Sequence, residues 1–146
     1  MSMIDHSYPL FLVIIPALAI IKTYIIFNTT FKQLSSLMLK CHSVQRLLWV
    51  FGTLITASIF SFATDYTCLY QYDNSAFAVT NKLSPSFISD FYNFFYFSLI
   101  TFSTVGYGDI TPVSNIAKFI IMLEIGLSFL IVVFAIANIK KAHLNV

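Results

Sequence analysis

The sequence predicts an all-α membrane protein with three membrane-spanning helices and one short re-entrant helix. Of the 146 residues, 58% are hydrophobic and only 10% are charged, whereas soluble domains carry about 25% charged residues. Three apolar runs, 10–27, 47–63 and 116–139, approach the roughly 20 residues that a helix needs to cross a bilayer. This number of charged residues is too small to cover a water-facing surface. A protein embedded in lipid therefore explains the composition better than a soluble protein with a large core.

The first apolar run predicts an N-terminal transmembrane helix within residues 1–27. In the following connection, 28–45, apolar residues recur at helical spacing with lysines and serines between them. This pattern is typical of an amphipathic helix at the inner membrane surface. The alternative is a short cytoplasmic linker in which apolar and polar residues alternate by chance. Lys22, the charged residue of the first run, is expected to extend along the helix to the inner interface.

The second and third runs predict an outer helix over 46–63 and an inner helix over 116–139, with a tail over 140–146. The stretch after the outer helix is mixed and polar, with Asp65, Asn74 and Pro85 among its residues. It predicts a loop over 64–88 that is exposed outside the membrane.

The distribution of charge predicts the orientation of the chain. Every Asp lies outside two segments, the 28–46 connection and the tail, and basic loops stay in the cytoplasm. We therefore expect a multi-pass protein of the cell membrane with its N-terminus outside and its C-terminus cytoplasmic. The basic residues are too sparse to indicate nucleic-acid binding. Those in or beside the two segments are Lys22, Lys32, Lys40, Arg46, Lys140 and Lys141.

An aromatic and apolar segment over 89–102 is only about half as long as a spanning helix. Ser89 is a suitable N-cap, and Asp90 suits the positive end of the helix dipole. Glycines follow the segment. We expect a short buried helix that enters the membrane and returns.

The segment 103–109 that follows this short helix has the residue types of an ion pathway. Non-helical backbone inside a membrane is tolerated only where protein or a water-filled path covers it. A dehydrated cation needs a shell of oxygens, which backbone carbonyls can supply. Gly106 and Gly108 permit the unusual backbone angles that turn carbonyls toward one axis. Thr104 would add a hydroxyl oxygen, and Val105 and Tyr107 would point away and brace the ring.

The stretch from Tyr96 to Pro112, YFSLITFSTVGYGDITP, closely resembles the pore loop of the potassium channel family, whose filters carry the TVGYG sequence. The resemblance covers residues 46–139, the potassium channel pore domain of the two-helix-plus-pore-loop type. The segment over 1–45 is additional, with an extra N-terminal membrane helix.

This resemblance implies the tetrameric potassium-channel pore fold, with passive K⁺ conduction through a homotetramer in the lipid bilayer. No cofactor is implied besides the permeant potassium ion, which backbone carbonyls would coordinate. The expected filter residues are Thr104, Val105, Gly106, Tyr107 and Gly108, with K⁺ at the first four. The expected supporting residues are Asp109, Tyr96, Thr101 and Ser103.

Two positions depart from the family pattern. Some relatives have a Glu at the position of Ile100 that pairs with the Asp after the filter, so Asp109 needs another partner, Tyr96 or water. Many relatives have a hinge glycine at the position of Ser128, whereas the nearest glycine here is Gly126. The candidate cavity or gate residues are Gly126, Ser128, Phe129, Val132, Val133 and Ile136.

Glu124 is an ionisable residue inside the predicted inner helix, where such groups are usually functional. Four copies facing the cavity would attract cations. A carboxyl group paired with a hydroxyl of the short helix, such as that of Thr101 or Ser98, is the alternative that its depth in the helix favours.

The sequence is compatible with three functions, and it does not indicate an enzyme. The complete TVGYG motif favours a potassium-selective channel over a weakly selective cation channel. A non-conducting or modulatory subunit of a larger cation channel is the third interpretation. An enzyme is not indicated, because the sequence has no nucleophile with a base, no metal-ligand spacing and no phosphate-binding loop.

Overall fold

The computed structural model describes residues 8–40, 44–80 and 86–144 as four long helices and a short antiparallel strand pair. Parts of the predicted segments 1–27, 28–45, 64–88 and 140–146 therefore lie outside the described residues. The elements are α1 (Tyr8–Lys40), α2 (Val44–Tyr72), the 3₁₀ turn η1 (Asn74–Ala76), β1 (Phe77–Val79), α3 (Phe87–Phe102), β2 (Ile110–Pro112) and α4 (Asn115–Leu144).

Among the described residues, two helices are long and apolar enough to cross a membrane, in α2 (Leu48–Tyr72) and in α4 (Asn115–Ala137). The apolar part of α1, Val13–Thr29, is shorter, so a third crossing stays a prediction. α1 continues without a break to Lys40. The described part of the connection predicted over 28–45 is thus an extension of the first helix, and its location at the membrane surface stays a prediction.

α2 continues to Tyr72 rather than ending at residue 63, so the boundary predicted for the outer helix was wrong. The polar side chains beyond residue 63 favour a loop by composition, but one side of this helical extension is apolar. Phe62, Tyr66 and Leu69 are buried at helical spacing on that side. Burial of this stripe favours the helix over the predicted exposed loop.

α3 begins at Phe87, two residues before the predicted start, and its N-cap is Ser86 rather than Ser89. Ser86 has extended backbone angles, and its carbonyl accepts the first helical hydrogen bond from the Asp90 N–H (3.0 Å). Asp90 does lie in the first turn, as expected from the helix dipole. α4 likewise begins one residue early and continues to Leu144, so the part of the predicted tail up to this residue is helical.

The sequence did not predict the two-stranded antiparallel pair, in which β1 follows α2 and β2 follows α3. Phe77 of β1 lies opposite Pro112 of β2, and Val79 lies opposite Ile110. Asp73 caps the preceding turn by accepting from the Ser75 N–H (2.9 Å). The pair fixes the segment after α3 to the segment after α2.

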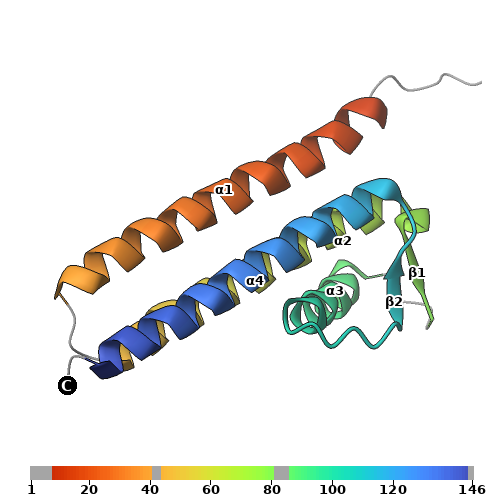
Figure 1. The fold of residues 1–146 in the computed structure, drawn as a ribbon. Helices are drawn as coiled ribbons and strands as arrows, with labels where there is room; N and C mark the ends of the chain where they lie inside the picture. The colour runs from red at the N-terminus through yellow and green to blue at the C-terminus, as the bar shows by residue number, and fades with distance from the viewer. Residues whose placement is uncertain (1–7, 41–43, 81–85, 145–146) are drawn as a thin grey trace, which may run out of the picture.

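Figure 1 shows α2 and α4 running side by side in opposite directions, with α1 along one side of this pair and α3 on the other. β1 and β2 lie at the end of the bundle where α4 begins, and the C-terminal ends of α1 and α4 lie at the opposite end. An aromatic cluster fills the space between α2, α3 and β1. Its members are Tyr66, Tyr70, Phe77, Phe94 and Phe97.

Candidate functional site

The segment after α3 is held against the last turn of that helix by its own backbone. The Thr104 N–H donates to the Thr101 carbonyl (3.0 Å). The N–H groups of Val105 and Gly106 both donate to the Ile100 carbonyl, at 2.9 and 3.3 Å. Three successive N–H groups therefore point toward α3.

The carbonyl groups of the same peptides point the other way. The described peptide bonds include no cis bond, and in a trans peptide the N–H and the preceding C=O point in opposite directions. Because the N–H groups of Thr104, Val105 and Gly106 face α3, the carbonyls of Ser103, Thr104 and Val105 face away from it. The main chain thus presents a row of oxygens on its outer side.

Left-handed backbone angles at every second residue maintain this arrangement. Thr104, Gly106 and Gly108 have φ values of +58°, +55° and +81°. Alternation of right- and left-handed residues turns successive N–H groups to one side of a chain, and their carbonyls to the other. Gly106 and Gly108 adopt these angles without steric cost, whereas Thr104 is in a region that non-glycine residues seldom occupy and that often marks functional sites.

The side chains of Val105 and Tyr107 are exposed in the single chain, at 53% and 71%. The Tyr107 ring stacks on Tyr96 of α3, with centroids 6.5 Å apart and planes inclined by 5°. The predicted supporting residues lie nearby. Ser103 is the C-cap of α3, and its hydroxyl donates to the Leu99 carbonyl (2.7 Å). Thr101 is buried and supplies the carbonyl that accepts from Thr104.

The other end of the segment is anchored by residues that sequence reasoning missed. The Asp109 carbonyl accepts from both the N–H (3.0 Å) and the hydroxyl (3.1 Å) of Thr80. Asp109 also interacts electrostatically with Tyr96 of α3, and Tyr96 or water stays the predicted partner of this carboxylate. The signal for the anchor was the run Phe77-Ala78-Val79 after an Asp-Asn-Ser turn, a short strand pattern inside a presumed loop.

Behind α3, Glu124 joins three helices through two hydroxyl groups, an arrangement that we call the Glu124 junction (Tyr66, Ser98 and Glu124). The Tyr66 hydroxyl of α2 donates to Oε2 of Glu124 (2.6 Å), and the Ser98 hydroxyl of α3 donates to Oε1. Glu124 itself is fully buried. The expectation that it pairs with a hydroxyl of the short helix is confirmed for Ser98.

Four of the candidate cavity residues lie on one exposed face of α4. Phe129 and Ile136 are 68% and 63% exposed, and Val132 and Val133 are both 43% exposed. Gly126 is exposed too, and an added Cβ there would meet nothing within 4 Å.

Ser128 does not share this face of α4. It is buried within the subunit, and its hydroxyl donates to the Ile125 carbonyl (2.8 Å). The predicted set thus divides between two sides of the helix.

The arrangement can bind a cation through backbone oxygens rather than through acidic side chains. In the described part of the chain, no group of three or more His, Cys, Asp or Glu residues could hold a metal ion. α3 directs its C-terminal, partly negative end toward the start of the oxygen row, which favours a positive charge there.

Comparison with known proteins agrees with this geometry. A family model described as "Ion channel" matches residues 51–144. The chain is 34% identical over 85 residues to potassium channel K2 of Plasmodium falciparum, and 32% identical over 90 residues to two-pore potassium channel 4 of Arabidopsis thaliana. It is also 34% identical over 68 residues to a hyperpolarization-activated voltage-gated potassium channel of Methanocaldococcus jannaschii.

These matches cover 56%, 60% and 47% of this chain but only 5%, 30% and 32% of the three relatives. No solved structure matches significantly. The family and its members are ion channels rather than enzymes, and the two apolar helices agree with an integral membrane protein. The chain therefore belongs to the ion-channel family, in its potassium channel pore-domain branch.

Proposed function

We propose that four copies of this chain form a potassium-selective channel and that residues 104–108 are its selectivity filter. The observation that carries the proposal is the row of carbonyls that faces away from α3, with left-handed angles at Thr104, Gly106 and Gly108. Oxygens arranged in this way replace the hydration shell of K⁺ when several chains contribute them. K⁺ ions bind at the levels of Thr104, Val105, Gly106 and Tyr107.

The cost of leaving these backbone groups unpaired supports an assembly of several copies. Residues 103–108 are exposed in the single chain, and unsatisfied backbone groups in a membrane cost several kcal/mol each. Neighbouring copies and the permeant ions satisfy them. The exposed apolar face of α4 then lines the cavity below the filter, with Phe129, Val133 and Ile136 along the ion path.

The orientation follows from the two ends of the bundle. Lys40 lies at the end of α1, and Lys140 and Lys141 lie near the end of α4. These ends lie together, opposite the end that carries β1 and β2 (Figure 1). Because basic segments stay in the cytoplasm, the filter opens to the outside of the cell membrane, the N-terminus lies outside, and α1 is a third crossing.

Cation flux into liposomes tests the proposal. Purified protein should admit Rb⁺ or K⁺ down a gradient, exclude Na⁺, and be blocked by Ba²⁺, an ion close to K⁺ in size. Equal Na⁺ flux would instead indicate a weakly selective cation channel. A stable tetramer without any flux would indicate a non-conducting subunit.

A further inference from the structure

One face of α1 contacts the rest of the chain. Ile15 and Ala19 are buried on this face, and Ile26, two turns further along, packs against the core. Neighbours of these residues, such as Leu18, Ile21 and Ile25, are exposed. The contact face therefore follows the spacing of a single helical stripe, which α1 packs against α2 and α4.

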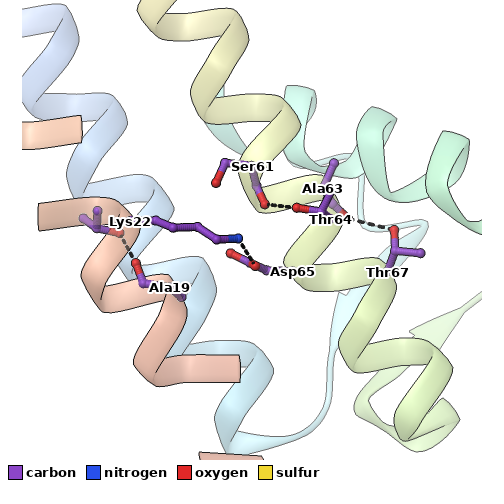
Figure 2. Close-up of polar contacts among 8 residues, drawn as sticks. Ala19, Lys22, Ser61, Ala63, Thr64, Asp65 and Thr67 are labelled. Carbon is purple, nitrogen blue, oxygen red and sulfur yellow. Dashed lines mark hydrogen bonds and ion pairs between the residues drawn. The ribbon is translucent and has the colours of Figure 1, made fainter. Parts of the chain in front are cut away.

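Lys22 lies on this same stripe and carries a charge into the contact. Its ammonium group forms an ion pair with Oδ1 of Asp65 in α2. Figure 2 shows the Lys22 side chain extending from α1 across to α2 rather than along its own helix. The expectation that Lys22 reaches the inner interface was therefore wrong, because Asp65 lies within reach in α2, not in an exposed loop.

Asp65 needs this partner because of its position. Its side chain is 9% exposed, and it lies inside the apolar segment Leu48–Tyr72. A charged group in a membrane is costly unless it is paired. Removing one member of a buried ion pair leaves the other charge uncompensated, which is far more damaging than the absence of both.

The ion pair adjoins the Glu124 junction. Asp65 directly precedes Tyr66 in α2, and the Tyr66 hydroxyl donates to Glu124 (2.6 Å). The cation that pairs with Asp65 comes from α1. Lys22 thus offsets the charge of Asp65, the residue next to the Tyr66 member of the Glu124 junction.

The junction in turn lies less than one helical turn from the filter support. The Ser98 hydroxyl donates to Glu124, and its oxygen also lies 3.1 Å from the Ile59 carbonyl oxygen of α2. Two residues after Ser98, the Ile100 carbonyl accepts the N–H groups of Val105 and Gly106. A displacement of Ser98 would therefore move the backbone that orients the filter carbonyls.

We propose that Lys22 is a positioning residue for the filter, which it influences from α1 through Asp65 and the Glu124 junction. In this proposal α1 influences conduction and does not serve only as a membrane anchor. This inference rests on the proposed channel function. It predicts that disruption of the ion pair changes how each channel conducts, and not only how many channels assemble.

Single-channel recording in planar bilayers tests this with four variants of the full chain. Lys22→Met removes the charge and keeps most of the stem. Lys22→Arg keeps the charge with a different head group. Lys22→Asp combined with Asp65→Lys exchanges the two charges. Ile21→Met is the matched control, because Ile21 is the neighbouring residue of α1 and its side chain is 54% exposed.

Lys22→Met should lower the open probability of each channel roughly tenfold, within the range of coupling between residues of one network, and reduce the K⁺ over Na⁺ permeability ratio. The Arg and charge-exchanged variants should recover most of both quantities, and Ile21→Met should match the unmodified channel. Unchanged open probability and selectivity in Lys22→Met would overturn the proposal, because a purely structural pair would alter only the yield of channels.

If Lys22→Met yields no channels, the charge-exchanged variant tests whether the ion pair supports conduction. If neither variant conducts, the pairing of Lys22 with Asp65 is contradicted. If the unmodified chain itself does not conduct, the proposed function fails instead, so the two failures are distinguishable.

Discussion

The filter segment and the Glu124 junction lie on either side of α3 and are built in opposite ways. The filter segment is exposed, and its shape comes from backbone angles and N–H groups that donate to α3. The junction is buried, and its shape comes from side-chain hydroxyls around one carboxyl group. The filter segment would be completed by other chains in the proposed tetramer, whereas the junction is formed within a single chain.

Mutations in the two regions should therefore have different effects. A change in the filter should affect conduction with little effect on the stability of the single subunit, since few of its contacts lie within the chain. A change in the junction or in the aromatic cluster should first lower stability. Predictions for the two regions can therefore be ordered by size and checked against each other.

The largest effect is expected for Gly106→Ala, which should reduce K⁺ flux to background. A left-handed conformation costs about 1–2 kcal/mol for a residue with a Cβ, and each of the four copies in the proposed tetramer would carry this strain. Gly52→Ala is the matched control. Gly52 lies in α2 without a positive φ, and an added Cβ would meet nothing within 4 Å, so its flux should be unchanged. Full flux in Gly106→Ala would contradict the filter assignment.

The next effect is expected for Phe94→Ala in the aromatic cluster. Phe94 is fully buried and its ring lies 4.9 Å from that of Phe77, so its removal should lower stability by about 3–5 kcal/mol. Thermal unfolding of the purified protein in detergent measures this. Phe87→Ala, at a 61% exposed position of the same helix, should cost much less. Equal losses of stability in the two variants would show that the aromatic cluster is not part of the hydrophobic core.

A smaller effect is expected at the junction itself. Glu124→Gln leaves one of the two hydroxyl donors without its carboxylate acceptor, and should cost about 1–3 kcal/mol. Tyr66→Phe removes only one donor and should cost about 0.5–1.5 kcal/mol. The same thermal assay should rank the two variants in this order. The reverse order would mean that Tyr66 has a partner more important than Glu124.

The smallest effect is expected for Thr80→Val at the outer anchor of the filter. This change removes the exposed hydroxyl bond to the Asp109 carbonyl and keeps the backbone N–H bond. The cost should be about 0.5 kcal/mol, with K⁺ selectivity intact in liposome flux. A loss of selectivity would mean that the side chain, not the backbone pairing, positions the outer end of the filter.

Much of the site could be predicted from the sequence because its chemistry depends on local residue types. Glycine at positions 106 and 108 predicts unusual backbone angles there. An apolar segment half as long as a spanning helix predicts a short helix. The hydroxyl partner of Glu124 followed from its depth in the inner helix, since a buried carboxyl group needs a donor.

The features that could not be predicted depend on contacts between distant segments. Asp65 is charged and was placed in a loop, and only packing of the three-dimensional structure places Lys22 opposite it. The β1–β2 pair is three residues long on each side, so the strand pattern at Phe77-Ala78-Val79 does not identify the distant segment with which it pairs. Ser86 and Ser89 are equally good caps by composition, and the helix start is decided by the backbone bond from Asp90 to Ser86.

The reversal potential of the unmodified channel between K⁺ on one side and Na⁺ on the other tests the central claim most directly. Carbonyl coordination by residues 104–108 predicts a strong shift toward the K⁺ equilibrium potential, and loss of all current in Gly106→Ala. A reversal potential near zero, with Gly106→Ala conducting like the unmodified chain, would contradict a selectivity filter at this segment.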